Sequence, residues 1–161
     1  MQDSNDSLIF VVEDNRVYNK LIVSYLKTNK FNNVMPFYSG EDTINNLYRN
    51  PDIIIQDFLL DGMNGIDVLK KAKEQNPNIE FIFLSGQTDI KVVLNALHQG
   101  AYDYIIKDAH AKENALIKID QIARYSKIRK EKELYRKSII IMVTALILSW
   151  ALVFWYYRFH K

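Results

Sequence analysis

The sequence has no cysteine and is poor in histidine, proline and glycine. Without cysteine, the chain of 161 residues can form neither a disulfide nor a thiolate metal site. Its three histidines, His98, His110 and His160, are scattered and show no zinc-ligand spacing. Disulfide-stapled and zinc-binding classes of protein are therefore excluded, and the composition is compatible with a reducing compartment.

Two further signals are absent, a secretory leader and a recognisable second domain. The first seven residues, MQDSNDS, are polar and acidic and lack the basic region that opens a signal peptide. No DNA-binding helix-turn-helix, no kinase nucleotide motif and no additional enzymatic domain is recognisable. With 48% hydrophobic and 25% charged residues, the chain is expected to fold as one compact domain with an appendage.

Charge is distributed unevenly along the chain. Residues 1–125 carry 13 basic and 17 acidic groups, a net charge of −4, whereas residues 126–161 carry 8 basic and 2 acidic groups, a net charge of +6. An acidic globular part argues against nucleic acid as the main partner, because binding to phosphates needs a basic face. A short basic segment beside an apolar run instead suits an anionic membrane surface.

Short apolar runs alternate with stretches of helical period from Leu8 to Ile106. This alternation predicts an α/β fold, in which a parallel sheet is covered by helices on both faces. Runs such as IFVV, IIIQ and FIFL are continuously apolar or nearly so, as expected for strands that are buried on both faces. The expected strands are Leu8–Val12, Val34–Tyr38, Ile53–Asp57, Ile79–Leu84 and Tyr102–Ile106. Helical spacing joins Val17 to Leu26, Ile44 to Leu47, Ile66 to Ala72 and Val92 to Leu97.

After Lys107 the pattern becomes one long helix. Its first part, from about Ala111, is expected to pack against the sheet through Leu116, Ile119, Ile122 and Ala123. Residues 126–137 are highly charged and predict a helical linker. Residues 138–157 contain no charged side chain, and 20 residues at about 1.5 Å each span about 30 Å, the thickness of the hydrocarbon core.

Residues 138–157 therefore predict a single transmembrane helix, followed by a short basic tail at residues 158–161. An alternative is a very apolar helix buried in a soluble assembly, which would need partners on all sides. Aromatic residues flank the apolar run, and the basic residues of the linker outnumber those after it, which predicts that residues 1–125 lie in the cytoplasm. Ala145 and Ser149 form one small-xxx-small pair, which is compatible with pairing of two copies.

Polar residues follow four of the five expected strands. They are Glu13 and Asp14 after the first strand, Asp57 at the end of the third, Ser85 after the fourth and Lys107 after the fifth. Ligands of an open parallel sheet collect beyond the carboxyl ends of its strands, so these side chains are expected to meet. Three carboxylates repel one another unless a cation neutralises them, and an all-oxygen set suits Mg²⁺. The ammonium and the hydroxyl suit a phosphoryl group, whose equatorial oxygens carry charge while a carboxylate attacks in line.

Asp57 is the expected nucleophile, because it ends a buried strand in the middle of this set. The loop after it contains Gly62 and Gly65, which are expected to let the backbone turn sharply. Gly86 directly follows Ser85 and is expected to leave room for a phosphate. Each of these residues alone would be read as an ordinary surface or capping group, and their joint placement is what indicates a site.

Four stretches resemble the receiver domain of bacterial two-component response regulators. They are LIFVVEDN, IIIQDFLLDGMNGIDVL, FIFLSGQTD and ALHQGAYDYIIKD, and the resemblance covers residues 8 to about 125. It implies a flavodoxin-like, doubly wound sheet of five parallel strands in the order 2-1-3-4-5 with five helices. It also implies phosphorylation of Asp57 by a histidine kinase or a histidine phosphotransfer protein, with Lys107 and Ser85 as catalytic partners. The implied Mg²⁺ ligands are Glu13 or its bound water, Asp14, Asp57 and the backbone carbonyl of Leu59.

The same resemblance implies a switch pair, Ser85 and Tyr104, in which the hydroxyl moves towards the phosphate and the aromatic ring turns inward. The surface of the fourth helix, fifth strand and fifth helix would then change. Two positions depart from the family pattern: Asp108 stands where proline usually follows the lysine in a cis peptide, and Asp61 stands where proline is frequent. Because a non-proline cis bond costs about 2.5 to 4 kcal/mol, we expect a trans Lys107–Asp108 bond. Leu59 cannot hydrogen-bond an attacking water, which predicts slow loss of the phosphate.

The sequence thus predicts a single-pass protein of the bacterial inner membrane that signals through contact with an unknown downstream protein. Its receiver domain, residues 1–125, would lie on the cytoplasmic side. It would catalyse only its own Mg²⁺-dependent phosphorylation and dephosphorylation, because no substrate pocket and no general acid for a separate substrate are recognisable. The alternatives are a membrane scaffold that works without phosphorylation and a phosphate sink that competes for a kinase's phosphoryl groups.

Overall fold

The computed structural model describes residues 6–159. The start of the polar N-terminal segment, residues 1–5, and the end of the expected basic tail, residues 160–161, lie outside this range. Within it the chain forms five strands, five α-helices and one short 3₁₀ helix at Leu47–Arg49. The strands are β1 (Ile9–Val12), β2 (Val34–Phe37), β3 (Ile53–Gln56), β4 (Glu80–Ser85) and β5 (Asp103–Ile106). The helices are α1 (Arg16–Thr28), α2 (Gly40–Asn45), α3 (Gly65–Gln75), α4 (Ile90–His98) and α5 (Ala111–Phe159).

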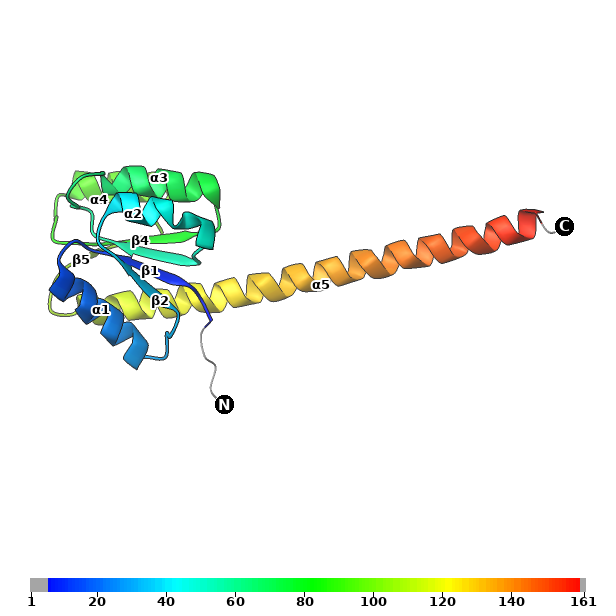
Figure 1. Cartoon of the computed structure of the whole chain (residues 1–161), viewed down its shortest axis with the longest axis horizontal. Helices are drawn as coiled ribbons and strands as arrows, with labels where there is room; N and C mark the ends of the chain where they lie inside the picture. The colour runs from blue at the N-terminus through cyan, green and yellow to red at the C-terminus, as the bar shows by residue number, and fades with distance from the viewer. Residues whose placement is uncertain (1–5, 160–161) are drawn as a thin grey trace. The chain divides into compact units, whose positions relative to one another are not determined.

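The five strands form one parallel sheet in the order β2-β1-β3-β4-β5 (Figure 1). In its centre, Ile9 of β1 pairs with Val34 of β2 on one side and with Ile53 of β3 on the other. The chain therefore reverses its direction of winding at β1 and β3, and this reversal is where ligands of such sheets collect. The predicted fold class and strand order are confirmed, and each strand boundary lies within one residue of its predicted place.

Hydrophobic side chains fill the space on both faces of the sheet. Alternate residues of a strand point to opposite faces, so Ile9 belongs to the core cluster that includes residues of α1 and α5, while Phe10 belongs to the cluster that includes residues of α3 and α4. Figure 1 shows the same division, with α1 and the first part of α5 on one face and α2, α3 and α4 on the other. All residues of β1 and β3 are buried, which confirms the prediction of two-sided burial. Each large apolar side chain buried in this way contributes about 1.5–3 kcal/mol to folding.

The face that helix α1 turns to the sheet agrees only in part with the one its apolar spacing indicates. Val17 and Leu21, both part of the expected helical pattern, are 80% and 45% exposed. The buried face carries Ile22 and Leu26, as the spacing predicts, and in addition the polar Asn19. Asn19 can be buried because its amide finds backbone carbonyls to bond at the ends of β1 and β2, and the spacing of apolar residues cannot reveal such a partner.

Helix α5 begins at Ala111 and continues without a break to Phe159. Its expected sheet-facing residues are confirmed, since Ile119, Ile122 and Ala123 are buried and Leu116 is partly buried. The chain divides into two compact units after Ala123, and the apolar stretch belongs to the second unit. By length and composition α5 could cross a membrane, and its most apolar part has no buried share in the described structure.

The hydroxyl groups of this apolar stretch are satisfied within the helix itself. Ser138, Thr144 and Ser149 each donate to a backbone carbonyl three or four residues earlier, at distances of 2.8 to 3.0 Å. Hydroxyls bonded in this way do not need water as a partner, so they are compatible with an apolar surrounding.

Candidate functional site

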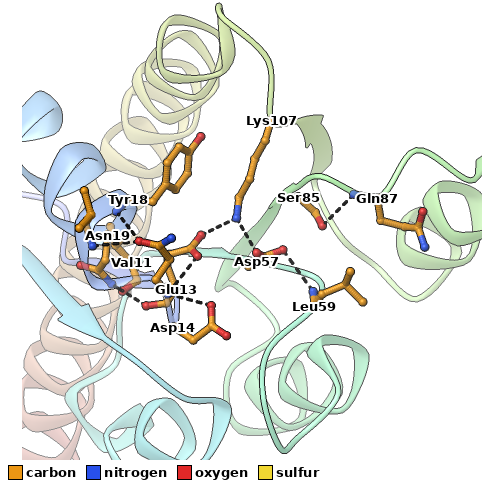
Figure 2. Close-up of polar contacts among 12 residues, drawn as sticks. Val11, Glu13, Asp14, Tyr18, Asn19, Asp57, Leu59, Ser85, Gln87 and Lys107 are labelled. Carbon is orange, nitrogen blue, oxygen red and sulfur yellow. Dashed lines mark hydrogen bonds and ion pairs between the residues drawn. The ribbon is translucent and has the colours of Figure 1, made fainter.

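The predicted site residues meet at the carboxyl edge of the sheet (Figure 2). The backbone N–H groups of Glu13, Asp57 and Lys107 donate to carbonyls of neighbouring strands at 3.1, 3.0 and 2.8 Å. The hydrogen-bonding ladder of the sheet thus extends just beyond the strand ends. These three residues are therefore held by the sheet itself, which makes their relative placement rigid.

Three carboxylates gather at this edge. One oxygen each of Glu13, Asp14 and Asp57 lies within 4.8 Å of the other two. Glu13 and Asp57 are only 4% and 8% exposed, whereas Asp14 is more open to solvent. Carboxylate oxygens this close repel one another, and they are the ligands that a hard divalent cation prefers. The chemistry and spacing of this cluster therefore suit Mg²⁺.

Lys107 reaches into this cluster from the loop after β5. Its Nζ donates to Glu13 Oε2 at 2.6 Å and to Asp57 Oδ2 at 2.5 Å. Burial raises the pKa of Glu13, and the hydrogen bond and charge of Lys107 offset only part of that effect. Burial lowers the pKa of Lys107, but its hydrogen bonds to Asp57 and Glu13 and their charges outweigh this, so the pKa ends above its ordinary value. Lys107 therefore stays charged at neutral pH and joins the two buried carboxylates.

The predicted switch residues both contact Gln87 in the loop between β4 and α4. Ser85 is completely buried, and its Oγ accepts the Gln87 N–H at 3.3 Å. The Tyr104 hydroxyl donates to the Gln87 carbonyl at 2.9 Å. Figure 2 draws Ser85 on the side of Asp57 away from Glu13. A displacement of this loop would therefore alter a hydrogen bond of Ser85 and a hydrogen bond of Tyr104.

An aromatic cluster connects Tyr104 to the segment that carries Asp57. The Tyr104 ring is 9% exposed, and its centre lies 5.8 Å from that of Phe83 and 6.1 Å from that of Phe58, the residue after Asp57. Burial raises the pKa of the Tyr104 hydroxyl, so it remains a neutral donor. The ring is therefore packed inward in this structure.

The glycines around the site have different roles. Gly62 has a φ of +95°, which suits the expected sharp turn. Gly65 has no positive φ and is the first residue of α3, so its role differs from that of Gly62. A Cβ at Gly65 would lie 2.9 Å from Phe83 Cε1 and 3.0 Å from Gln56 Nε2, and its missing side chain is what lets α3 approach the sheet. Gly86 has no atom within 4 Å of a Cβ position, as expected of a residue beside open space.

Two further expectations concern Leu59, in the loop after Asp57, and the Lys107–Asp108 peptide bond, in the loop after β5. The Leu59 N–H donates to Asp57 Oδ1 at 3.2 Å, and the Leu59 side chain is 59% exposed. Metal binding by the Leu59 carbonyl stays a prediction. The Lys107–Asp108 bond is trans, as expected, and Asp108 Oδ1 accepts the His110 N–H at 2.8 Å in the turn before α5.

Two residues of α1 contact the site although no sequence pattern singled them out. Asn19 Nδ2 donates to the carbonyls of Val11, Glu13 and Phe37 at 3.2, 3.3 and 2.8 Å, and so fastens the ends of β1 and β2 together. Tyr18 places its ring 4.7 Å from Lys107 Nζ. The only signal in the sequence for either residue is its helical spacing to Ile22, three residues after Asn19 and four after Tyr18.

Comparison with known families agrees with this fold and this site. The family model described as the response regulator receiver domain matches residues 9–119, and the chain belongs to this family. A receiver domain from Clostridium thermocellum superposes with a TM-score of 0.69 at 24% identity, covering 76% of this chain and 98% of that one. The BeF3-activated receiver domain of DrrB superposes with a TM-score of 0.67 at 25% identity, covering 73% of this chain and 97% of that one.

Curated relatives share the receiver region but are longer proteins. A cyclic di-GMP phosphodiesterase of Thermotoga maritima is 30% identical over 131 residues, which are 81% of this chain and 35% of that protein. The response regulator protein VraR of Staphylococcus saprophyticus is 31% identical over 109 residues, which are 66% of this chain and 52% of that protein. The regulatory protein LuxO of Vibrio cholerae is 31% identical over 94 residues, which are 58% of this chain and 21% of that protein. The match covers half or less of the length of most of these relatives. What they share with this chain is the receiver domain.

Proposed function

We propose that this chain is a membrane-anchored receiver that accepts a phosphoryl group on Asp57 from a histidine kinase or a histidine phosphotransfer protein. The observation that carries the proposal is the arrangement around Asp57. Its Oδ2 lies 2.5 Å from Lys107 Nζ, and oxygens of Glu13 and Asp14 lie within 4.8 Å. Membership of the receiver family supports the choice of phosphodonor, because receiver domains act with such proteins.

In the proposed reaction, one carboxylate oxygen of Asp57 attacks the phosphorus of a phosphohistidine. The bond between phosphorus and the histidine nitrogen breaks, and its electron pair stays on that nitrogen. The leaving imidazole takes up one proton from solvent and is released in its neutral form. The products are an aspartyl phosphate and a free histidine. Lys107 and the Ser85 hydroxyl supply positive charge and a hydrogen-bond donor to the phosphoryl oxygens, which is where charge must be stabilised in such a transfer.

Glu13, Asp14 and Asp57 fit a Mg²⁺ ion by their oxygen chemistry and spacing, and the Leu59 carbonyl is the proposed fourth protein ligand. When bound, the ion would neutralise phosphoryl charge. Each carboxylate has several lone pairs, so Glu13 and Asp57 can offer an oxygen to a cation and still accept from Lys107.

We expect the output to be a change in the surface of α4, β5 and the first part of α5. Tyr104 holds the Gln87 carbonyl in the loop that leads into α4, so a movement of its ring would shift this loop. Helix α4 buries only Ala96 completely, so several apolar side chains of this region are exposed. They are Ile90, Leu94 and Leu97 of α4 and Ile106 of β5, which are 39% to 64% exposed. A downstream protein or a second copy of the chain is the expected partner.

The second part of the proposal is that residues 138–157 cross the bacterial inner membrane. It is supported by the uncharged length of this stretch, by its internally bonded hydroxyl groups and by the lack of any buried share of the helix there. The excess of basic residues in the linker supports a cytoplasmic position for the receiver domain.

The phosphorylation is tested on the full chain in detergent micelles. The protein is incubated with acetyl phosphate, with and without Mg²⁺, and its intact mass is measured beside that of Asp57→Asn. We expect one added phosphate that requires Mg²⁺ and does not form on the variant. No addition to the parent chain under any condition would favour the scaffold that works without phosphorylation. Rapid hydrolysis of the product would favour a phosphate sink, and a long-lived product a switch.

A further inference from the structure

Lys107 has an aromatic neighbour in addition to the two carboxylates. Its Nζ lies 4.7 Å from the centre of the Tyr18 ring. An ammonium within about 6 Å of a ring centre is attracted to the ring face, with an effect of about two- to thirtyfold on an equilibrium or a rate. Figure 2 shows the ring beside the head of Lys107, with Glu13 and Asp57 also facing that head.

Tyr18 is the better fixed of the two partners. It stands in the first turn of α1, and its backbone N–H donates to Asn15 Oδ1 at 3.1 Å. Its ring packs against the hydrophobic core on the α1 and α5 face of the sheet. Lys107 instead carries its charge on a flexible stem of four carbons. The contact therefore restricts the lysine more than the tyrosine.

We infer that Tyr18 is a positioning residue that keeps the ammonium of Lys107 over Asp57 during phosphoryl transfer. The inference rests on the proposed function and assigns to it a residue of α1. Two attractions hold Lys107 in the structure, one to the carboxylates of Glu13 and Asp57 and one to the ring. A divalent cation in the acidic cluster would weaken the first by neutralising negative charge, but it leaves the second in place. Tyr18 therefore matters most when the site is loaded with a cation.

The competing explanation is that Tyr18 only fills space beside the core. Two substitutions separate these roles: Tyr18→Phe keeps the ring, whereas Tyr18→Leu keeps an apolar side chain without it. Tyr25 provides a matched control, because it is a half-buried tyrosine of the same helix with a lysine, Lys112, 5.2 Å from its ring centre. Tyr25→Leu removes the same kind of contact at a distance from the site.

The first measurement is the rate of phosphorylation of the full chain in micelles by acetyl phosphate at saturating Mg²⁺. We expect Tyr18→Phe and Tyr25→Leu to stay within about twofold of the parent and Tyr18→Leu to be slower by about tenfold, within the range of a cation–π contact. In a Lys107→Met background, Tyr18→Leu should have little further effect, because no ammonium is left to position. Equal slowing with and without Lys107 would assign Tyr18 a merely structural role and overturn the inference.

The second measurement does not depend on phosphorylation. In a ¹³C spectrum of the full chain labelled at lysine Cε, the Lys107 signal should be shifted by the ring current of Tyr18, and Lys107→Arg identifies that signal by its loss. We expect the shift to persist in Tyr18→Phe and on addition of Mg²⁺, and to vanish in Tyr18→Leu. Loss of the shift when Mg²⁺ is added to the parent would overturn the inference.

The failures of the inference and of the proposed function are distinguishable. If the parent chain takes no phosphate, the proposed function is wrong and the inference falls with it. If the parent is phosphorylated and Tyr18→Leu keeps pace, only the role of Tyr18 is overturned.

Discussion

Leu59 and Asp57 are two residues apart in one loop, but their side chains have opposite surroundings. Asp57 is buried, whereas the Leu59 side chain is 59% exposed beside it and offers no hydrogen bond to a water that approaches the aspartyl phosphate. We predict that Leu59→Asn loses its phosphate about tenfold faster than the parent, a change of about 1.4 kcal/mol in the barrier, because an amide can orient the attacking water. The decay of the phosphorylated mass after removal of the donor measures this. Leu59→Met, which stays apolar, should decay like the parent, and a Leu59→Asn variant as slow as Leu59→Met would contradict the idea.

Gln56, next to the phosphoacceptor, is a polar residue in a fully buried position. Its side chain is completely buried, and neither polar atom of its amide has a hydrogen-bond partner in the described part of the chain. An unmet buried polar group costs about 1–3 kcal/mol. We therefore predict that Gln56→Met, which has a similar length and no such group, raises the free energy of unfolding by about 1 kcal/mol. Urea denaturation measures it, and a loss of stability would show that the amide has a partner after all.

At the scale of elements, the approach of α3 to the sheet depends on the absence of a side chain at Gly65. A Cβ there would lie 2.9 Å from the buried ring of Phe83, which cannot move freely. We predict that Gly65→Ala lowers the free energy of unfolding by about 1–3 kcal/mol through overpacking. Gly86→Ala, which meets no atom within 4 Å, is the matched control and should unfold like the parent. Equal denaturation midpoints for the two variants would refute this packing.

Asn19 of α1 connects this helix to the carboxyl ends of β1 and β2 through hydrogen bonds. Its amide nitrogen is shared among three backbone carbonyls at the ends of the two strands, where the acidic pair begins. We predict that Asn19→Leu lowers the free energy of unfolding by about 2–4 kcal/mol, because it removes the hydrogen bonds that the buried amide donates to three backbone carbonyls. Thr28→Ala removes an exposed hydrogen bond at the end of the same helix and should change stability by less than about 0.5 kcal/mol. Denaturant unfolding of both variants tests this, and comparable effects would argue against a special role for Asn19.

At the scale of the whole molecule, the question is whether the apolar end of α5 lies in a membrane. We predict that the parent chain, expressed in a bacterial cell, sediments with membranes and is released by detergent but not by salt or alkaline carbonate. Leu146→Arg combined with Leu148→Arg should release the chain, since each charge near the middle of a spanning helix costs about 2.5–3.5 kcal/mol. Leu134→Arg, in the charged linker, should leave the distribution unchanged. Release of the parent by carbonate would favour the soluble assembly.

Much of this molecule could be read directly from the chain. The strands were predictable because short apolar runs between turn residues favour buried strands over helices, and Ile9–Val12 and Ile53–Gln56 are buried throughout. The site was predictable for a topological reason: in a parallel sheet all carboxyl ends share one edge, so residues such as Glu13, Asp57 and Lys107 must come near one another. The uncharged length of residues 138–157 is likewise a property of the chain alone.

Other features exist only once the chain is folded, because they depend on what distant segments bring to a residue. Asn19 is buried and Val17 is exposed because carbonyls of β1 and β2 act together with the apolar spacing of Ile22 and Leu26 to select the inner face of α1. The position of Gly65, at the start of α3, has no room for a side chain because the ring of Phe83 from β4 lies against it. The Tyr18 ring meets Lys107 across 89 positions of sequence only because the start of α1 and the residue after β5 both reach the site at the carboxyl edge of the sheet. Local patterns record the periods and lengths of elements, whereas the partner of each side chain is set by packing between them.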